Sequence, residues 1–86
     1  LMGTINCLEY SRKHKARFIF LSTSRVYPIE YINELNFKET KTRFELSDNQ
    51  SIACVSSQGI TEGFPLDKSR TLYGATKLSS ELIIQE

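Results

Sequence analysis

The sequence lacks a dominant charge, a long apolar run and a signal sequence pattern. Eleven basic and ten acidic residues leave a formal net charge of +1, so charge gives no argument for nucleic acid as a main partner. No apolar run approaches the roughly 20 residues that span a bilayer. Residues 1–6 show no basic segment followed by an apolar one, the pattern typical of signal peptides. We therefore expect neither a nucleic-acid-binding nor a membrane protein.

Cysteine and histidine are also scarce. Cys7 and Cys54 are far apart, and no histidine pattern accompanies them. This predicts two reduced thiols in a cytoplasmic protein rather than a disulfide or a metal site. The single histidine, His14, stands among basic residues, and a solvated helix end explains it better than catalysis. We expect no bound metal.

The first third of the sequence predicts a helix followed by a buried strand. A helix is expected over residues 1–13, where Leu1, Ile5 and Leu8 fall at helical spacing. Residues 18–21, Phe-Ile-Phe-Leu, form a continuous apolar run, typical of strands in parallel sheets, which are buried on both faces. Because the 86 residues begin and end within helix-like patterns, we expect an interior segment of a larger domain.

Three hydroxyl side chains, Ser22, Thr23 and Ser24, follow the predicted strand. In open α/β sheets, ligands bind outside the carboxyl ends of the strands, so these hydroxyls are candidates for ligand binding. They could equally satisfy backbone groups in a turn. Position alone leaves both interpretations open.

Residues 29–70 show weak periodicity and several polar, turn-prone stretches. The apolar pieces at 44–46 and 52–55 predict a small hairpin across the polar residues 47–51. A connection of this length is usually functional or disordered. Its scattered aromatic residues favour an ordered, functional loop.

A second helix is expected after Thr71, a plausible N-cap. Tyr73 and Lys77 are four residues apart, so they project from one face of this helix, one turn apart. The positive charge of the lysine favours the tyrosinate over the phenol; at an effective dielectric near 20 and a separation of about 5 Å, the attraction is roughly 3 kcal/mol. Such a tyrosine can act as a proton shuttle. Taken alone, the pair is also consistent with a chance arrangement on a surface helix.

The order of these elements resembles the extended short-chain dehydrogenase/reductase family of NAD-dependent nucleotide-sugar epimerases and dehydratases. The similar segments are the strand with its hydroxyl motif at 18–27, the Glu-Gly-Phe-Pro approach at 62–65, and the Tyr-Gly-Ala-Thr-Lys motif at 73–77. The resemblance implies an α/β fold in which residues 1–86 are an interior segment of a Rossmann-type, doubly wound parallel sheet. The Gly-rich cofactor turn and the carboxyl-terminal substrate region of such a domain are absent from these residues.

The resemblance also implies roles for individual residues. Tyr73 would be the catalytic acid and base, and Lys77 would bind the nicotinamide ribose and favour loss of the tyrosine proton. Thr23, four residues before Tyr27, would orient the reacting sugar hydroxyl, although Ser22 or Ser24 could take this role if the count is shifted by one. The implied assignments are Thr23, Tyr73 and Lys77 for catalysis, Ser22, Tyr73 and Lys77 for NAD, and Thr23, Ser24 and Arg25 for the nucleotide sugar.

Within that family, dehydratases typically carry Asp-Glu directly after the catalytic threonine. Here Ser24 and Arg25 occupy those positions, which favours epimerisation through a transient keto sugar. Similarity to the CDP-paratose 2-epimerase (CDP-tyvelose epimerase) group lies in residues 39–44, 59–62 and 69–73. Pro28 stands where the family commonly has glycine, which leaves the geometry of the substrate loop open.

Several alternatives to a 2-epimerase remain. A nucleotide-sugar 4-epimerase, a dehydratase or a reductase of the same superfamily would share these motifs. A non-catalytic nucleotide-binding protein could keep the fold without turnover. The resemblance further implies a homodimer or higher homo-oligomer, formed through the helices at 1–13 and 71–86.

Overall fold

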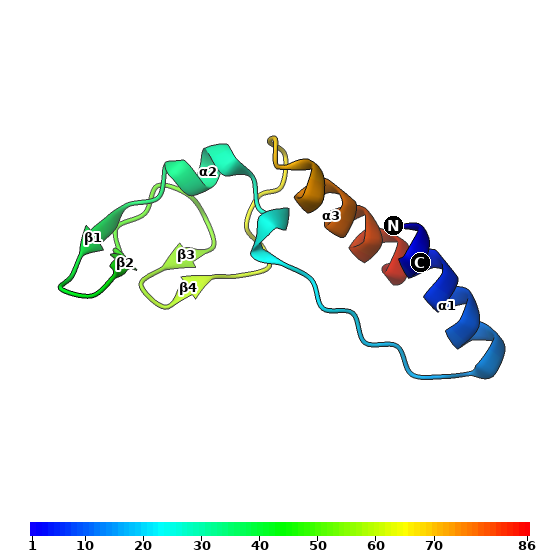
Figure 1. The fold of residues 1–86 in the computed structure, drawn as a ribbon. Coiled ribbons are helices and arrows are strands. Elements are labelled where there is room, and N and C mark those ends of the chain that lie inside the picture. Colours follow the sequence, from blue (N-terminus) through cyan, green and yellow to red (C-terminus); the bar gives the residue numbers. More distant parts are fainter. The chain divides into compact units, whose positions relative to one another are not determined.

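The computed structural model describes residues 1–86, and Figure 1 shows its secondary-structure elements, with the α-helices and strands labelled. They are helix α1 (Met2–His14), the 3₁₀ turn η1 (Ser24–Val26), helix α2 (Ile29–Asn33), strands β1 (Phe37–Glu39), β2 (Phe44–Leu46), β3 (Val55–Ser56) and β4 (Gly59–Ile60), and helix α3 (Leu72–Gln85). Two units divide these elements: a helical unit of residues 1–26 and 70–86, and a loop unit of residues 27–69.

Helix α1 confirms the helix predicted for residues 1–13. Its last turn carries Arg12, Lys13 and His14, and cations are favourable at the negative end of the helix dipole. The helix ends at Lys15, which adopts the left-handed conformation with φ 53°. This reversal lets the backbone N–H of Ala16 donate to the carbonyl of Ser11 at 2.9 Å, which closes the helix end.

The strand predicted at 18–21 is unpaired among residues 1–86, and only half of its side chains are partly buried. The segment is extended, but it belongs to no strand ladder. Phe18 and Phe20 are half-buried, whereas Ile19 and Leu21 are 79% and 81% exposed, so its side chains alternate between two faces. Both sheets in the structure are two-stranded and antiparallel. A parallel sheet needs hydrogen-bonded neighbours beside this segment, and no other segment among residues 1–86 supplies them.

Helix α1 packs against α3 through small polar side chains. The hydroxyl of Thr4 donates to the hydroxyl of Ser80 at 3.3 Å, and Ser80 donates in turn to the carbonyl of Thr76 at 3.0 Å. Ser80 is only 2% exposed. Its buried hydroxyl is therefore satisfied on both sides, as buried polar groups require.

An aromatic cluster forms the core of the loop unit. Phe64 is 2% exposed, and the rings of Tyr27 and Tyr31 meet it edge-on at centroid distances of 5.2 and 6.0 Å, a favourable arrangement for aromatic pairs. The Tyr31 hydroxyl donates to Asp67 at 2.7 Å. This hydrogen bond lowers the pKa of Asp67 and raises the pKa of Tyr31.

Pro28 is completely buried and forms the N-cap of α2 with φ −63°. That φ value is the one that the proline ring imposes. The next residue, Ile29, donates its backbone N–H to the carbonyl of Ser69 at 3.0 Å, which joins the two ends of the loop unit. The residue that departs from the family pattern therefore starts a helix and fills the core.

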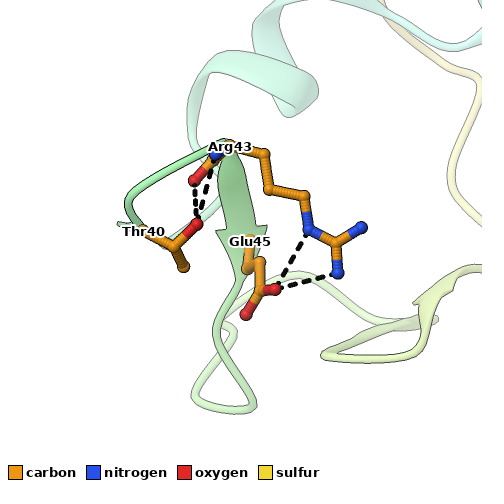
Figure 2. A network of polar contacts seen from close by, with 3 residues as sticks. All are labelled: Thr40, Arg43 and Glu45. Carbon is orange, nitrogen blue, oxygen red and sulfur yellow. Dashed lines mark hydrogen bonds and ion pairs between the residues drawn. The ribbon is translucent and has the colours of Figure 1, made fainter.

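The predicted hairpin between residues 44–46 and 52–55 is wrong in its pairing. Residues 44–46 do form a strand, β2, but its partner is β1, with Phe37 opposite Leu46 and Glu39 opposite Phe44. The Thr40 hydroxyl donates to the Arg43 carbonyl at 2.7 Å and accepts from the Arg43 N–H at 3.2 Å, as Figure 2 shows. This closed turn gives β2 a partner after a shorter loop than the predicted pairing needs.

The second predicted strand lies elsewhere as well. Residues 52–54 are not in a strand, and Val55 begins β3, which pairs with β4 across the two-residue turn at 57–58. Cys54 has φ 68°, the left-handed region that strands do not use. The chain direction therefore changes just before Val55, and the predicted strand cannot extend back through Cys54.

We expect Phe64→Ala to lower the free energy of unfolding by about 3–5 kcal/mol, because the substitution empties the centre of the aromatic cluster. Urea-induced unfolding of the protein measures this change. Phe44→Ala is the matched control, since Phe44 is 66% exposed and loses only its ring contact with Phe37, worth at most about 1.5 kcal/mol. Equal losses for the two variants would contradict the assignment of Phe64 as the core.

Candidate active site

Helix α3 begins at the capped residue that the sequence predicts. The side-chain oxygen of Thr71 accepts the backbone N–H of Gly74 at 3.0 Å, and the Thr71 carbonyl accepts the N–H of Ala75 at 2.9 Å. This N-cap satisfies donors that the first helical turn would otherwise leave free. It also fixes the start of the turn that carries Tyr73.

Residues 21–26 lie alongside α3 and run antiparallel to it. Near the middle of α3, the Lys77 ammonium donates to the carbonyl of Leu21 at 2.8 Å. The hydroxyl of Ser22 hydrogen-bonds to the carboxylate of Glu81. Lys77 and Glu81 are one helical turn apart on the same face. This face of α3 therefore binds Leu21 and Ser22, at the start of the segment 22–24 that carries the three hydroxyls.

The other end of the segment meets the amino-terminal end of α3. The side-chain Nε of Arg70 donates to the carbonyl of Val26 at 2.7 Å. The carbonyl of Arg25 approaches Gly74 so closely that a side chain on Gly74 would overlap it. The backbone of Thr23 lies between these two sets of contacts, and so alongside the turns of α3 that carry Tyr73 and Lys77.

Thr23 takes part in the turn that it begins. Its side-chain oxygen accepts the backbone N–H of Arg25 at 3.2 Å, and its carbonyl accepts the N–H of Val26 at 3.3 Å. The interpretation that these hydroxyls satisfy a turn therefore holds for Thr23. A hydroxyl has one donor and two acceptor lone pairs, so the Thr23 hydroxyl keeps its proton and one lone pair for a ligand.

Tyr73 is available for chemistry. The residue is 58% exposed, and no hydrogen bond of its hydroxyl to another protein group is present among residues 1–86. Lys77 lies one turn further along α3, with its ammonium 4.3 Å from the centroid of the Phe20 ring. An ammonium has three donors, and the bond to Leu21 uses one of them, which leaves two for a ligand.

The other predicted site residues, Ser22, Ser24 and Arg25, differ in whether their side chains are free to bind a ligand. Ser24 and Arg25 are exposed in η1, while the hydroxyl of Ser22 is already engaged by Glu81. The sequence analysis assigned no role to Arg70, Gly74 or Glu81. The spacing of Glu81 four residues after Lys77 is the one local signal that could have drawn attention to it.

Two further observations concern metals and membranes. Nowhere in residues 1–86 do three or more His, Cys, Asp or Glu residues gather in a group that could hold a metal ion; Cys7 and Cys54 are exposed, free thiols. None of the helices has the combination of length and apolar character that crossing a membrane requires.

Comparison with known proteins gives one match. The family described as "NAD dependent epimerase/dehydratase family" matches residues 1–86, the whole of the chain. Neither a curated protein nor a solved structure matches.

The Thr71 cap yields a prediction about the stability of α3. Thr71→Ala should lower the free energy of unfolding by about 1 kcal/mol, because the N–H of Gly74 loses its acceptor. Thr71→Ser keeps a side-chain oxygen at the same position and should retain the stability. Urea-induced unfolding compares the two variants, and equal stability of the alanine and serine proteins would argue against the cap.

Proposed function

The chain belongs to the NAD dependent epimerase/dehydratase family, and we propose that it carries the catalytic residues of an NAD-dependent nucleotide-sugar epimerase. The observation that carries the proposal is the exposed, unpartnered hydroxyl of Tyr73 on the same helix as Lys77, with the hydroxyl segment 22–24 held along that helix. In this arrangement the groups proposed as proton shuttle and cation lie on α3, and the proposed orienting hydroxyl lies in the segment beside that helix.

The residues of this site are suited to a nicotinamide cofactor. Lys77 retains two donors that could bind the ribose hydroxyls, and the carbonyl of Leu21 holds its ammonium in place at 2.8 Å. The Ser22 hydroxyl is hydrogen-bonded to Glu81, one turn of α3 beyond Lys77. When bound, NAD supplies reversible acceptance of a hydride.

The protein groups would then handle the proton and the orientation of the sugar. Tyr73 would remove the proton of the sugar hydroxyl as the carbon that bears it loses a hydride, which produces a ketone. Thr23 would use its remaining donor and lone pair to orient that hydroxyl. After the ketone turns its other face to the cofactor, reduction and return of the proton from Tyr73 invert the centre with no net redox change.

We also place these residues within a larger, Rossmann-type domain with a doubly wound parallel sheet. Residues 18–21 are extended, with Ile19 and Leu21 almost fully exposed. A central strand would have these properties before neighbouring strands and helices cover it. The phosphate-binding turn and the substrate-selecting region would lie in other parts of that domain.

The finer assignment is to an enzyme like CDP-paratose 2-epimerase, acting at C2 of a deoxysugar. It rests on the similarity of residues 39–44, which form the end of β1, its turn and the start of β2. It also rests on Ser24 and Arg25, which provide no carboxylate pair for the elimination of water. Assays of the full-length protein with CDP-, UDP- and GDP-sugars would separate this substrate from those of 4-epimerases, dehydratases and reductases.

Tyr73→Phe is the direct test of the proposed mechanism. The substitution keeps the ring and removes only the ionisable hydroxyl, so we expect turnover to fall by roughly 10²–10⁴-fold, the usual contribution of general acid–base catalysis. Tyr10→Phe is a matched control, because Tyr10 is similarly exposed on α1. Near-normal epimerisation by the Tyr73→Phe enzyme, with its fold confirmed by circular dichroism, would refute the mechanism.

Alanine substitution of each hydroxyl in turn identifies the one that orients the sugar. Thr23→Ala should reduce turnover on the order of tenfold, the value of one lost hydrogen bond, and should leave the affinity for NAD unchanged because the partner of Thr23 is the sugar. Steady-state kinetics and NAD titration measure the two effects. A larger loss for Ser22→Ala or Ser24→Ala would move the assignment by one residue.

A further inference from the structure

Gly74 lies where the backbone of η1 comes closest to α3. Gly74 is buried, and a Cβ atom built on it would overlap the carbonyl oxygen of Arg25 and lie 2.9 Å from its carbonyl carbon. Real Cβ atoms do not come this close to another heavy atom. Because the obstructing atoms belong to the backbone, no side-chain rotation could make room for a methyl group.

Helix formation does not explain a glycine at this position. Alanine is the better helix former, and the N–H of residue 74 would reach the Thr71 cap with either side chain. The other glycine within a helix, Gly3, has no atom within 4 Å of its built Cβ. The absence of a side chain at Gly74 therefore serves the contact with Arg25.

The same turn is held at a second point, and both points connect to Thr23. Arg70 donates to the carbonyl of Val26 at 2.7 Å, next to the carbonyl that meets Gly74. Within the turn, the N–H of Val26 donates to the carbonyl of Thr23, and the N–H of Arg25 donates to the Thr23 side chain. A displacement of Arg25 and Val26 must therefore also move Thr23.

We propose that Gly74 is a positioning residue, whose missing side chain lets η1 pack closely enough against α3 to place the Thr23 hydroxyl where it orients the sugar for proton transfer to Tyr73. Arg70 holds the turn in that position. This inference rests on the proposed function. It adds that the glycine directly after Tyr73 controls the catalytic geometry through a backbone contact, without touching substrate or cofactor.

The test compares Gly74→Ala with Gly3→Ala in the full-length enzyme. Small displacements of a positioned group are enough to lose its contribution to the rate, so Gly74→Ala should lower kcat about tenfold, the loss expected when the Thr23 hydroxyl is removed. The Kd for NAD should not change, because Lys77 stays in place. Gly3→Ala should leave both values unchanged. A normal kcat for Gly74→Ala would overturn the proposal.

Combining substitutions distinguishes positioning from a general loss of structure. If Gly74 acts through Thr23, adding Gly74→Ala to Thr23→Ala should reduce kcat by less than about twofold more, because the positioned hydroxyl is already absent. Independent effects would instead multiply to a loss of about a hundredfold, and that outcome would contradict the proposal. If the Gly74→Ala protein does not fold, Arg70→Gln replaces it in the same cycle, with Arg17→Gln as its exposed control.

Amide hydrogen exchange separates this inference from the proposed function. A full-length wild-type protein that epimerises no nucleotide sugar would refute the proposed function. The packing of the turn is measured independently by exchange of the Val26 N–H. This exchange should be faster in Gly74→Ala than in Gly3→Ala or wild type, because a turn displaced from α3 leaves the buried Val26 more accessible to water. Unchanged exchange at Val26 would overturn the positioning role whatever the activity.

Discussion

The helical unit depends on one set of contacts. Backbone carbonyls of residues 21–26 pack against α3 and the residues just before it. Residues 21–26 have no neighbouring strand to supply hydrogen-bond donors, so the carbonyls of Leu21 and Val26 accept from side chains. Lys77 donates to Leu21 and Arg70 donates to Val26, while Gly74 gives way to the carbonyl of Arg25. Lys77 and Arg70 therefore supply hydrogen bonds that neighbouring strands would supply in a sheet, and the absence of a side chain at Gly74 allows the segment to approach α3.

This constraint gives Lys77 two functions. The lysine that we propose as the ribose ligand is also the anchor that holds Leu21, and its ammonium lies over the ring of Phe20. Its position is thus set before a cofactor binds, which reduces the entropy lost on binding. Tyr73 differs, because the residue is exposed and its hydroxyl has no protein partner. One helix thus presents an anchored ammonium group and a phenol hydroxyl without a protein partner.

The loop unit is ordered by a core of its own, independent of any sheet. Phe64 is enclosed by the rings of Tyr27 and Tyr31, and the hydrogen bond from Tyr31 to Asp67 joins the start of the unit to its end. The two short hairpins extend from this core with turns closed by local hydrogen bonds, as at Thr40 and Arg43. A long connection can be ordered in this way because aromatic side chains bury a large area for few residues.

The sequence by itself determined the features that depend on neighbours a few residues apart. These are helices α1 and α3, the cap at Thr71, and the shared helix face of Tyr73 and Lys77, since 3.6-residue periodicity and capping are local rules. The tertiary structure decided the partner of β2 and the unpaired state of residues 18–21, because strand pairing depends on segments that compete for the same edge. It alone identified the contacts of Arg70 with Val26, of Gly74 with Arg25 and of Glu81 with Ser22, each between residues 44 or more positions apart. Local periodicity carries no record of such contacts, because they arise only when the folded chain brings distant backbone groups together.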